Sequence, residues 1–207
     1  MKKQTFLPIA LLLSASAMTT ILSAQSMTAE TVETKTEPAV KSSTTKDPSF
    51  MDRYYELKGS YNAPTTVYGH YAAASCTKEK FMERYNAIKA AYPKLTDVWG
   101  NYAGSEYALE DFIKRYYEIK DSETFPALTK YYGDYAASQK TFPEFMKRYN
   151  QVKDSSPTLS EVYGQYAASD NELTEFSARY NGIKASNTGM KNCYGEYAGS
   201  TKKLSSK

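Results

Sequence analysis

Residues 145–168 read FMKRYNQVKDSSPTLSEVYGQYAA, and four other parts of the chain repeat this pattern. Each copy begins with phenylalanine, followed three and four residues later by arginine and tyrosine. Each ends with an aromatic residue, glycine, one variable residue, tyrosine and alanine. Successive copies are 31, 31, 33 and 31 residues apart, as counted between their first residues, Phe50, Phe81, Phe112, Phe145 and Phe176. Five agreements at this density indicate an internal repeat.

The first half of each copy has the period of an α-helix. Phe145, Tyr149 and Val152 are spaced so that all three lie on one helical face. Thr141 and Glu144, just before this stripe, have the spacing of a capping box, which marks a helix start. The pattern therefore predicts a helix in the first half of every unit.

The second half also has helical spacing. Leu159, Val162 and Tyr166 recur at intervals of three and four, and Pro157 stands where a helix takes its first residue. An alternative is a β-hairpin built on the Tyr-Gly-x-Tyr motif, but the upstream leucine and valine favour a helix of about a dozen residues. A glycine recurs in the second half of every copy, although glycine is costly inside a helix. We therefore expect the helix face that carries this small residue to be approached closely by another helix or by a ligand.

These halves predict an all-α protein, with a solenoid-like array of five helix-turn-helix repeats over residues 50–200. A unit of two short helices cannot bury its apolar face alone, so neighbouring units must stack. The first and last copies are less regular than the others, as terminal units of an open stack should be. A basic tail follows at residues 201–207.

The spacing of Gly133, Phe145, Tyr149, Val152 and Pro157 resembles the framework of the tetratricopeptide repeat. The resemblance covers the repeat region. The unit is about three residues shorter than that family's, and Phe and Val stand where the family has small alanines. The resemblance implies a curved solenoid with a concave groove for a peptide or another extended partner.

The N-terminal segment predicts export. Residues 1–24 carry two lysines, a short apolar run and small residues, the layout of a signal peptide. A membrane anchor is the alternative, but the run is short for a bilayer. Residues 25–49 lack aromatic residues and read as a disordered, flexible linker. We expect a secreted, periplasmic or cell-surface-associated protein, with no membrane span after cleavage.

The composition excludes several kinds of chemistry. A net charge of +3 argues against nucleic-acid binding, and one histidine with two cysteines argues against a metal centre. No cofactor motif or catalytic set is present, so the sequence predicts no enzyme, although scattered carboxylates leave that alternative open. The one histidine, His70, occupies a slot that is polar in every copy and is therefore expected to face water. In the other copies this slot holds Asn101, Asp134, Gln165 and Glu196.

The two cysteines are too far apart to bridge in an open stack. Cys193 occupies the slot that holds valine in three other copies, and Cys76 lies in a turn near the first copy. A span of more than three units is on the order of 30 Å, against about 6 Å between the Cα atoms of a disulfide. A bridge would therefore require a closed or strongly wound array.

Repeated arginines are the candidate binding residues, together with tyrosines outside the repeat. The arginines have structural alternatives, namely stacking on a tyrosine ring or capping carbonyls between units. We expect a non-enzymatic binding or scaffold module that makes protein–protein contacts with a protein or peptide partner. The alternative is binding of a cell-wall or carbohydrate polymer, such as a cell-surface glycan, by an Arg/Tyr ladder. The candidates are Arg53, Arg84, Arg115, Arg148, Arg179, Tyr92, Tyr107 and Tyr117.

Overall fold

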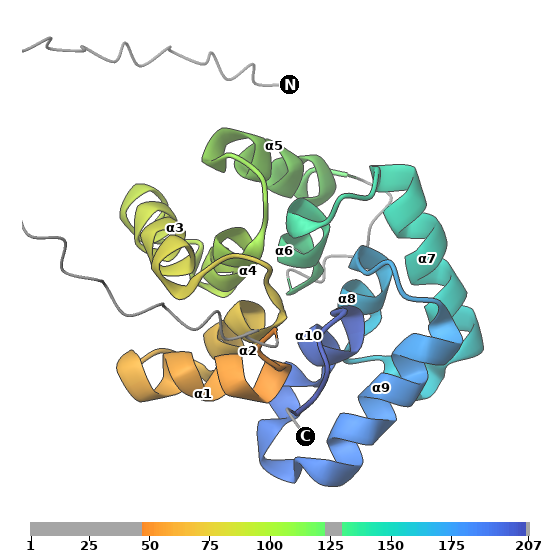
Figure 1. The fold of residues 1–207 in the computed structure, drawn as a ribbon. Coiled ribbons are helices and arrows are strands. Elements are labelled where there is room, and N and C mark those ends of the chain that lie inside the picture. Colours follow the sequence, from red (N-terminus) through yellow and green to blue (C-terminus); the bar gives the residue numbers. More distant parts are fainter. Residues whose placement is uncertain (1–46, 123–129, 206–207) are drawn as a thin grey trace, which may run out of the picture. The chain divides into compact units, whose positions relative to one another are not determined.

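In the computed structural model, the described residues are 47–122 and 130–205. Every regular element among them is helical, ten α-helices and three 3-10 helices (Figure 1). The predicted all-α class is confirmed. The predicted signal peptide and residues 25–46 of the predicted linker lie outside the described residues. None of the helices in the described part of the chain is long and apolar enough to cross a membrane.

The helices form five pairs, one for each copy, in which an outer helix packs on the inner helix that follows it. The outer helices are α1 (Phe50–Ser60), α3 (Lys78–Ala91), α5 (Leu109–Lys120), α7 (Phe142–Ser155) and α9 (Leu173–Ser186). The inner helices are α2 (Thr65–Ala73), α4 (Trp99–Gly104), α6 (Lys130–Ala137), α8 (Tyr163–Ala168) and α10 (Tyr194–Gly199).

Two of the outer helices, α1 and α7, begin with a capping box, as the sequence predicts for α7. At α7, the Glu144 side chain accepts a hydrogen bond of 2.8 Å from the backbone N–H of Thr141, which closes the capping box. At α1, Ser49 and Asp52 form a capping box of the same kind. These contacts satisfy N–H groups that have no partner within the helix, so the helix starts are fixed locally.

The inner halves are helical, which excludes the β-hairpin alternative, but they are shorter than predicted. Pro157 starts a single 3-10 turn, η2 (Pro157–Leu159), and the α-helix begins only at Tyr163. Similar 3-10 segments, η1 (Thr96–Val98) and η3 (Thr188–Cys193), precede α4 and α10. The prediction of a continuous helix from Pro157 is therefore wrong, because Val162, with φ −125° and ψ 18°, interrupts the helical backbone.

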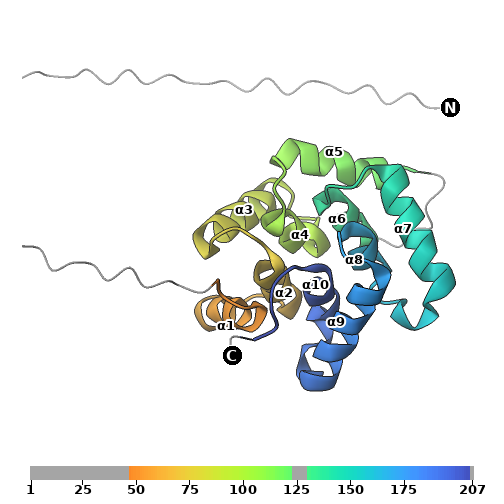
Figure 2. The same ribbon diagram turned by 45° about the vertical axis from the view of Figure 1, so that its right-hand side comes forward.

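The inner helices form a closed ring. Each packs on the next, from α2 through α4, α6 and α8 to α10, and α10 packs in turn on α2. Figures 1 and 2 both show the inner helices around a common centre, with the outer helices around them. The open stack that the repeat pattern predicts is therefore wrong, because α10 of the last unit packs on α2 of the first.

The interface between the last and the first unit, which closes the ring, has the same aromatic contact as the four interfaces between consecutive units. In each, the last tyrosine of an inner helix meets the first repeated phenylalanine of the next unit, edge to face, which is a favoured arrangement of two rings. The ring centroids are 5.3 Å apart for Tyr71–Phe81, 5.3 Å for Tyr102–Phe112, 5.3 Å for Tyr135–Phe145, 5.4 Å for Tyr166–Phe176 and 5.3 Å for Tyr197–Phe50.

The C-terminal segment completes the first outer helix. The backbone N–H groups of Phe50 and Met51 donate to the carbonyls of Lys203 and Leu204, at 2.8 and 3.0 Å. In the second unit, the backbone N–H group of Phe81 makes the corresponding hydrogen bond to the carbonyl of Thr77 at 2.9 Å. Residues 201–205, expected to be a tail outside the repeat domain, therefore take part in the folded unit.

The repeated glycines lie where neighbouring inner helices approach each other. A Cβ added at Gly133 would lie 2.6 Å from Oδ1 of Asn101 and 2.9 Å from Cγ1 of Val98. Gly195 is approached in the same way by Gln165 and Val162 of the preceding unit. The expectation that another helix approaches this small face closely is confirmed.

Both cysteines are free. Cys193 is buried at the closing interface, where its sulfur lies 3.3 Å from the carbonyl oxygen of Thr65. The Cys76 sulfur instead lies 3.9 Å from the carbonyl oxygen of Ala103, between the first and second units. Ring closure therefore does not bring a disulfide with it, because the two thiols are directed at different interfaces.

Candidate functional site

The repeated arginines bind the ends of the inner helices. Arg148 donates to the carbonyls of Tyr166 and Asn171 at 3.3 and 2.6 Å, and its guanidinium carbon lies 4.4 Å from the centroid of the Tyr166 ring. The same combination of carbonyl and ring contacts occurs at Arg53, Arg84, Arg115 and Arg179.

These contacts confirm stacking on a tyrosine ring and the capping of carbonyls, but the capped carbonyls belong to the inner helix of the same unit and to the connection that follows it. Guanidinium N–H groups that point at inner-helix carbonyls are not directed at solvent, so the argument for an arginine ladder on the surface weakens. Ligand binding by the arginines stays a prediction.

The candidate tyrosines are dispersed. Tyr92 is half-buried, and its carbonyl accepts a hydrogen bond of 3.0 Å from the indole of Trp99. Tyr107 lies against Arg115, with the guanidinium carbon 4.9 Å from its ring centroid. Tyr117 is 40 % exposed on α5. They do not form one surface with each other, although Tyr107 shares a cluster with an arginine.

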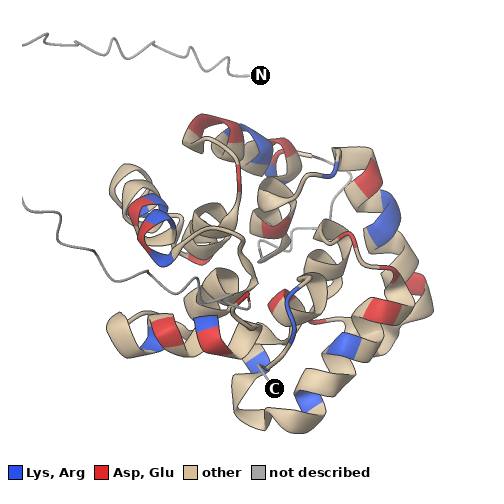
Figure 3. Cartoon of the chain, viewed as in Figure 1, with Lys and Arg blue, Asp and Glu red and all other residues tan. Residues whose placement is uncertain are grey.

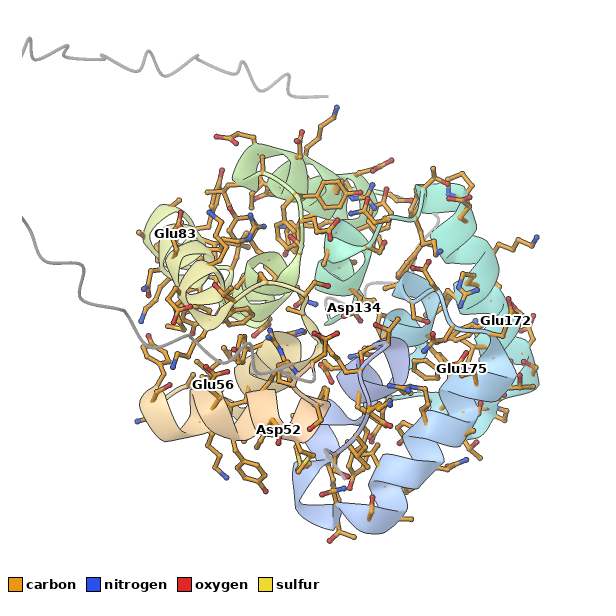
Figure 4. All side chains as sticks on the ribbon, viewed as in Figure 1. Asp52, Glu56, Glu83, Asp134, Glu172 and Glu175 are labelled. Carbon is orange, nitrogen blue, oxygen red and sulfur yellow. The ribbon has the colours of Figure 1, made fainter. Side chains whose placement is uncertain are left out.

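The polar slot of the inner helices faces the axis of the ring, where His70, Asn101, Asp134, Gln165 and Glu196 come together. We call these five residues the collar. Two cavities in the described part of the chain are lined by all five. Figure 4 shows Asp134 extending from α6 toward this centre.

The expectation that this slot faces water is wrong. The Glu196 and His70 side chains are only 7 % and 16 % exposed, and Asn101 and Asp134 are buried. The physical reason is closure, because a slot that lines the concave side of an open stack lines the axis of a closed ring.

The collar residues interact across neighbouring units. The Asn101 amide donates to a carboxylate oxygen of Asp134 at 3.1 Å. The His70 Nε2 lies 3.9 Å from Oε1 of Glu196 across the closing interface. Oε1 of Gln165 is buried and has no hydrogen-bond partner.

Burial sets the charge of the collar. It raises the pKa of Glu196 to about 8, with a smaller contribution from the charge of Asp134, while a hydrogen bond from Gln165 opposes the shift. Burial also lowers the pKa of His70 to about 4. At pH 7, therefore, His70 is neutral and Glu196 is mostly protonated.

Two cavities reach the collar from opposite ends of the inner helices. The N-terminal cavity, where the inner helices begin, has a volume of about 670 Å³ and a wall that includes Tyr61, Tyr85 and Trp99. The C-terminal cavity has a volume of about 210 Å³ and is lined, besides the collar, by small residues at the helix ends. The larger volume falls in the range of small-ligand sites.

Charge is distributed unevenly between the two layers of helices. Asp134 and Glu196 are the only carboxylates on the five inner helices, and Lys130 at the start of α6 is their only Lys or Arg. Most of the other charged residues lie on the outer helices and connections (Figure 3). The axis therefore combines oxygen-rich side chains with a low density of positive charge.

The sequence contained a signal for the collar that its first interpretation missed. The slot lies between a buried glycine and a buried tyrosine in every copy, yet it is never apolar. A polar residue flanked on both sides by buried residues in a short helix indicates an enclosed polar site. The comparisons with known proteins find no family model, no curated protein and no solved structure that matches this chain.

Proposed function

We propose that the helical unit is an exported, non-enzymatic binding module whose ligand enters the N-terminal cavity and contacts the collar. This keeps the binding function that the sequence predicts and moves it from an exposed stack surface to the ring axis. The partner would be a small molecule or the end of a larger one, because the site is a cavity and not an extended groove.

One observation supports this proposal most strongly. The five copies agree at the residues that build the frame, the phenylalanine, arginine and tyrosine positions, but carry five different side chains in the slot that faces the axis. A slot that served only packing would be expected to repeat like its neighbours. Five different polar groups around one cavity provide an asymmetric set of contacts of the kind that gives ligand sites their specificity.

Binding has more support than catalysis. The amides of Asn101 and Gln165 donate to the carboxyl groups of Asp134 and Glu196. No serine, cysteine or lysine side chain belongs to the collar, so a nucleophile paired with a base is missing from these five residues. Turnover of a bound compound would revive the enzyme alternative through the two carboxyl groups.

A blocked cavity provides the test. Thr66 is exposed and lines the N-terminal cavity, so Thr66→Trp should obstruct it, whereas Glu83→Trp adds the same side chain to the outer face of α3. A small-molecule library containing amines, acids, sugars and short peptides is screened by ligand-observed NMR. We expect compounds that bind the wild type and Glu83→Trp but not Thr66→Trp. Hits that bind all three proteins equally would refute an axial site.

Protein–protein contacts on the outer surface are a second candidate function. Tyr55 and Tyr117, on α1 and α5, are 56 % and 40 % exposed and are the large apolar side chains most open to solvent in the described residues. Exposed tyrosines are favourable contact residues at interfaces. If this function holds, Tyr55→Ser with Tyr117→Ser should abolish partner capture from the exported fraction, while Thr66→Trp should not.

A further inference from the structure

We propose that the axial site binds an organic cation, with an ammonium or guanidinium head in the collar and an apolar body along the wall of the N-terminal cavity. This deepens the proposed function and rests on it.

The collar has more acceptors than donors. Asp134 and Glu196 contribute four carboxyl oxygens and Asn101 and Gln165 two amide oxygens, whereas the donors are the N–H groups of His70 and of the two amides and the O–H group of protonated Glu196. The hydrogen bonds from Asn101 to Asp134 and from Gln165 to Glu196 already use two of the donors. A ligand that complements this set must donate several hydrogen bonds and accept few, as ammonium and guanidinium groups do.

Gln165 provides an independent observation. Its Oε1 is buried beside the cavity without a hydrogen-bond partner. A buried carbonyl oxygen left without a donor costs free energy on the order of 1–3 kcal/mol. A donor-bearing ligand head in the collar would supply the missing hydrogen bond.

Few of the described basic side chains line the N-terminal cavity. The five repeated arginines bind the carbonyls at the helix ends, as described above. Among the residues that the structure describes, Lys89 is the only Lys or Arg that lines the N-terminal cavity, and its ammonium lies 5.8 Å from the centroid of the Trp99 ring. Among the described side chains, none of the arginines and only one lysine therefore compete with an external cation for this cavity.

The wall of the N-terminal cavity suits the body of such a ligand. Tyr61, Tyr85 and Trp99 line it, and Trp99 occupies a slot that holds tyrosine in the other copies. The edge of one ring meets the next in this group, with centroids 6.1 Å apart for Tyr61–Tyr85 and 5.9 Å for Tyr85–Trp99. Aromatic walls bind both alkyl chains and cations, so they add to the affinity for a cation on an apolar chain.

Two probes of matched shape test the proposal. n-Butylguanidinium and n-butylurea differ in charge but hardly in size, and each is titrated into the full exported chain by calorimetry and by NMR. We expect saturable binding of n-butylguanidinium, at least 10-fold tighter than of n-butylurea. At pH 7 the binding should release a proton, because a bound cation favours ionised Glu196. The released proton is measured as a dependence of the binding heat on buffer ionisation enthalpy.

Isosteric variants locate the site. Asp134→Asn and Glu196→Gln keep the size of the collar and remove its carboxylates, and each should weaken n-butylguanidinium at least 10-fold. Glu83→Gln, on the outer face of α3, is the matched control and should leave binding unchanged (Figure 4). Circular dichroism and thermal unfolding confirm that each variant is folded. The peptide Gly-Arg-Gly distinguishes a peptide side chain from a free amine as the source of the head group.

The outcomes separate this inference from the proposed function. Equal binding of n-butylguanidinium and n-butylurea, abolished by Thr66→Trp, would keep the axial binding site and refute cation recognition. Cation recognition by the collar would also be refuted if n-butylguanidinium bound tightly and neither Asp134→Asn nor Glu196→Gln changed its affinity. No binding of either probe, together with library hits blocked by Thr66→Trp, would leave the binding module in place with a different ligand class.

Discussion

Arg115 shows at the scale of one residue how a repeated cation holds two helices together. It extends from α5 and donates to the carbonyls of Tyr135, Ser138 and Lys140 at 3.0, 3.0 and 2.7 Å. Carbonyls at the end of a helix have no partner within it, so each guanidinium compensates several groups at once. The sequence identified these arginines but could not distinguish this role from ligand binding, because both require the same residue at the same spacing.

Replacing this arginine tests the structural role. Arg115→Met should lower the free energy of unfolding by about 2–4 kcal/mol, because half-buried carbonyls lose charged donors. Lys114→Met, at the neighbouring exposed position of α5, is the control and should change it by less than about 0.5 kcal/mol. Urea unfolding followed by circular dichroism measures both. Equal stability of the two variants would contradict the structural role.

The collar makes stability depend on pH in a predictable direction. The pKa of His70 falls to about 4 in the folded protein, so the unfolded chain binds more protons between pH 4 and 6.5 and stability is lost as pH falls through that range. The pKa of Glu196 rises to about 8, so the folded chain binds more protons above pH 4.5 and stability is lost as pH rises toward 8.

These opposing effects predict that the free energy of unfolding is nearly constant at first and then falls as the pH rises. They largely cancel between pH 4.5 and 6.5, and above pH 6.5 only Glu196 acts, which lowers the free energy of unfolding by about 2 kcal/mol by pH 8. Urea midpoints measured from pH 4 to 9 should show this shape. Glu196→Gln should abolish the decline above pH 6.5. A decline that survives in this variant would assign it to other groups.

At the scale of the element, the glycines of the inner helices set how closely neighbouring units approach. Gly133→Ala in α6 should destabilise the protein by about 1–3 kcal/mol, since the new methyl group would collide with Asn101 and Val98. This loss should occur although alanine is the better helix former. Gly182→Ala in α9 is the matched control, because nothing lies within 4 Å of its added Cβ, and it should stabilise by about 0.5–1 kcal/mol. Thermal unfolding of the pair measures the difference, and stabilisation by both would contradict close helix packing.

The outer helices were predictable because their signals are local. A stripe of apolar residues at helical spacing defines each of them within about a dozen residues, and a capping box marks the start of α1 and α7. The inner helices were predicted as helical but too long, since Pro157 favours the first turn of an α-helix and a 3-10 turn equally well. Their short α-helical segments depend on packing between units, which no single copy encodes.

At the scale of the whole helical unit, closure could not be predicted from the repeat. Similar copies imply that units stack, but whether five of them complete a turn depends on the small rotation at each interface. The misjudged environment of His70 follows from this, because the same slot is a surface in an open stack and an axis in a ring. The sequence therefore contained the pattern of polar residues that forms the candidate site, but it did not show that these residues lie at the axis of a ring.

The C-terminal segment should stabilise the ring by completing α1. Deletion of residues 201–207 removes the carbonyls that accept from the N–H groups of Phe50 and Met51, so it should lower the melting temperature. It should also increase hydrogen exchange at these two amides more than at Phe81, whose acceptor Thr77 is retained. Unchanged exchange at Phe50 after the deletion would contradict the role of this segment.

The ring itself is tested most directly by a nuclear Overhauser measurement between the aromatic protons of Phe50 and Tyr197. Their ring centroids are 5.3 Å apart, the same distance as for Tyr102 and Phe112 within the chain. Closure predicts cross-peaks of similar intensity for both pairs. A cross-peak between Tyr102 and Phe112, with none between Tyr197 and Phe50, would show an open array and contradict the axial site that depends on closure.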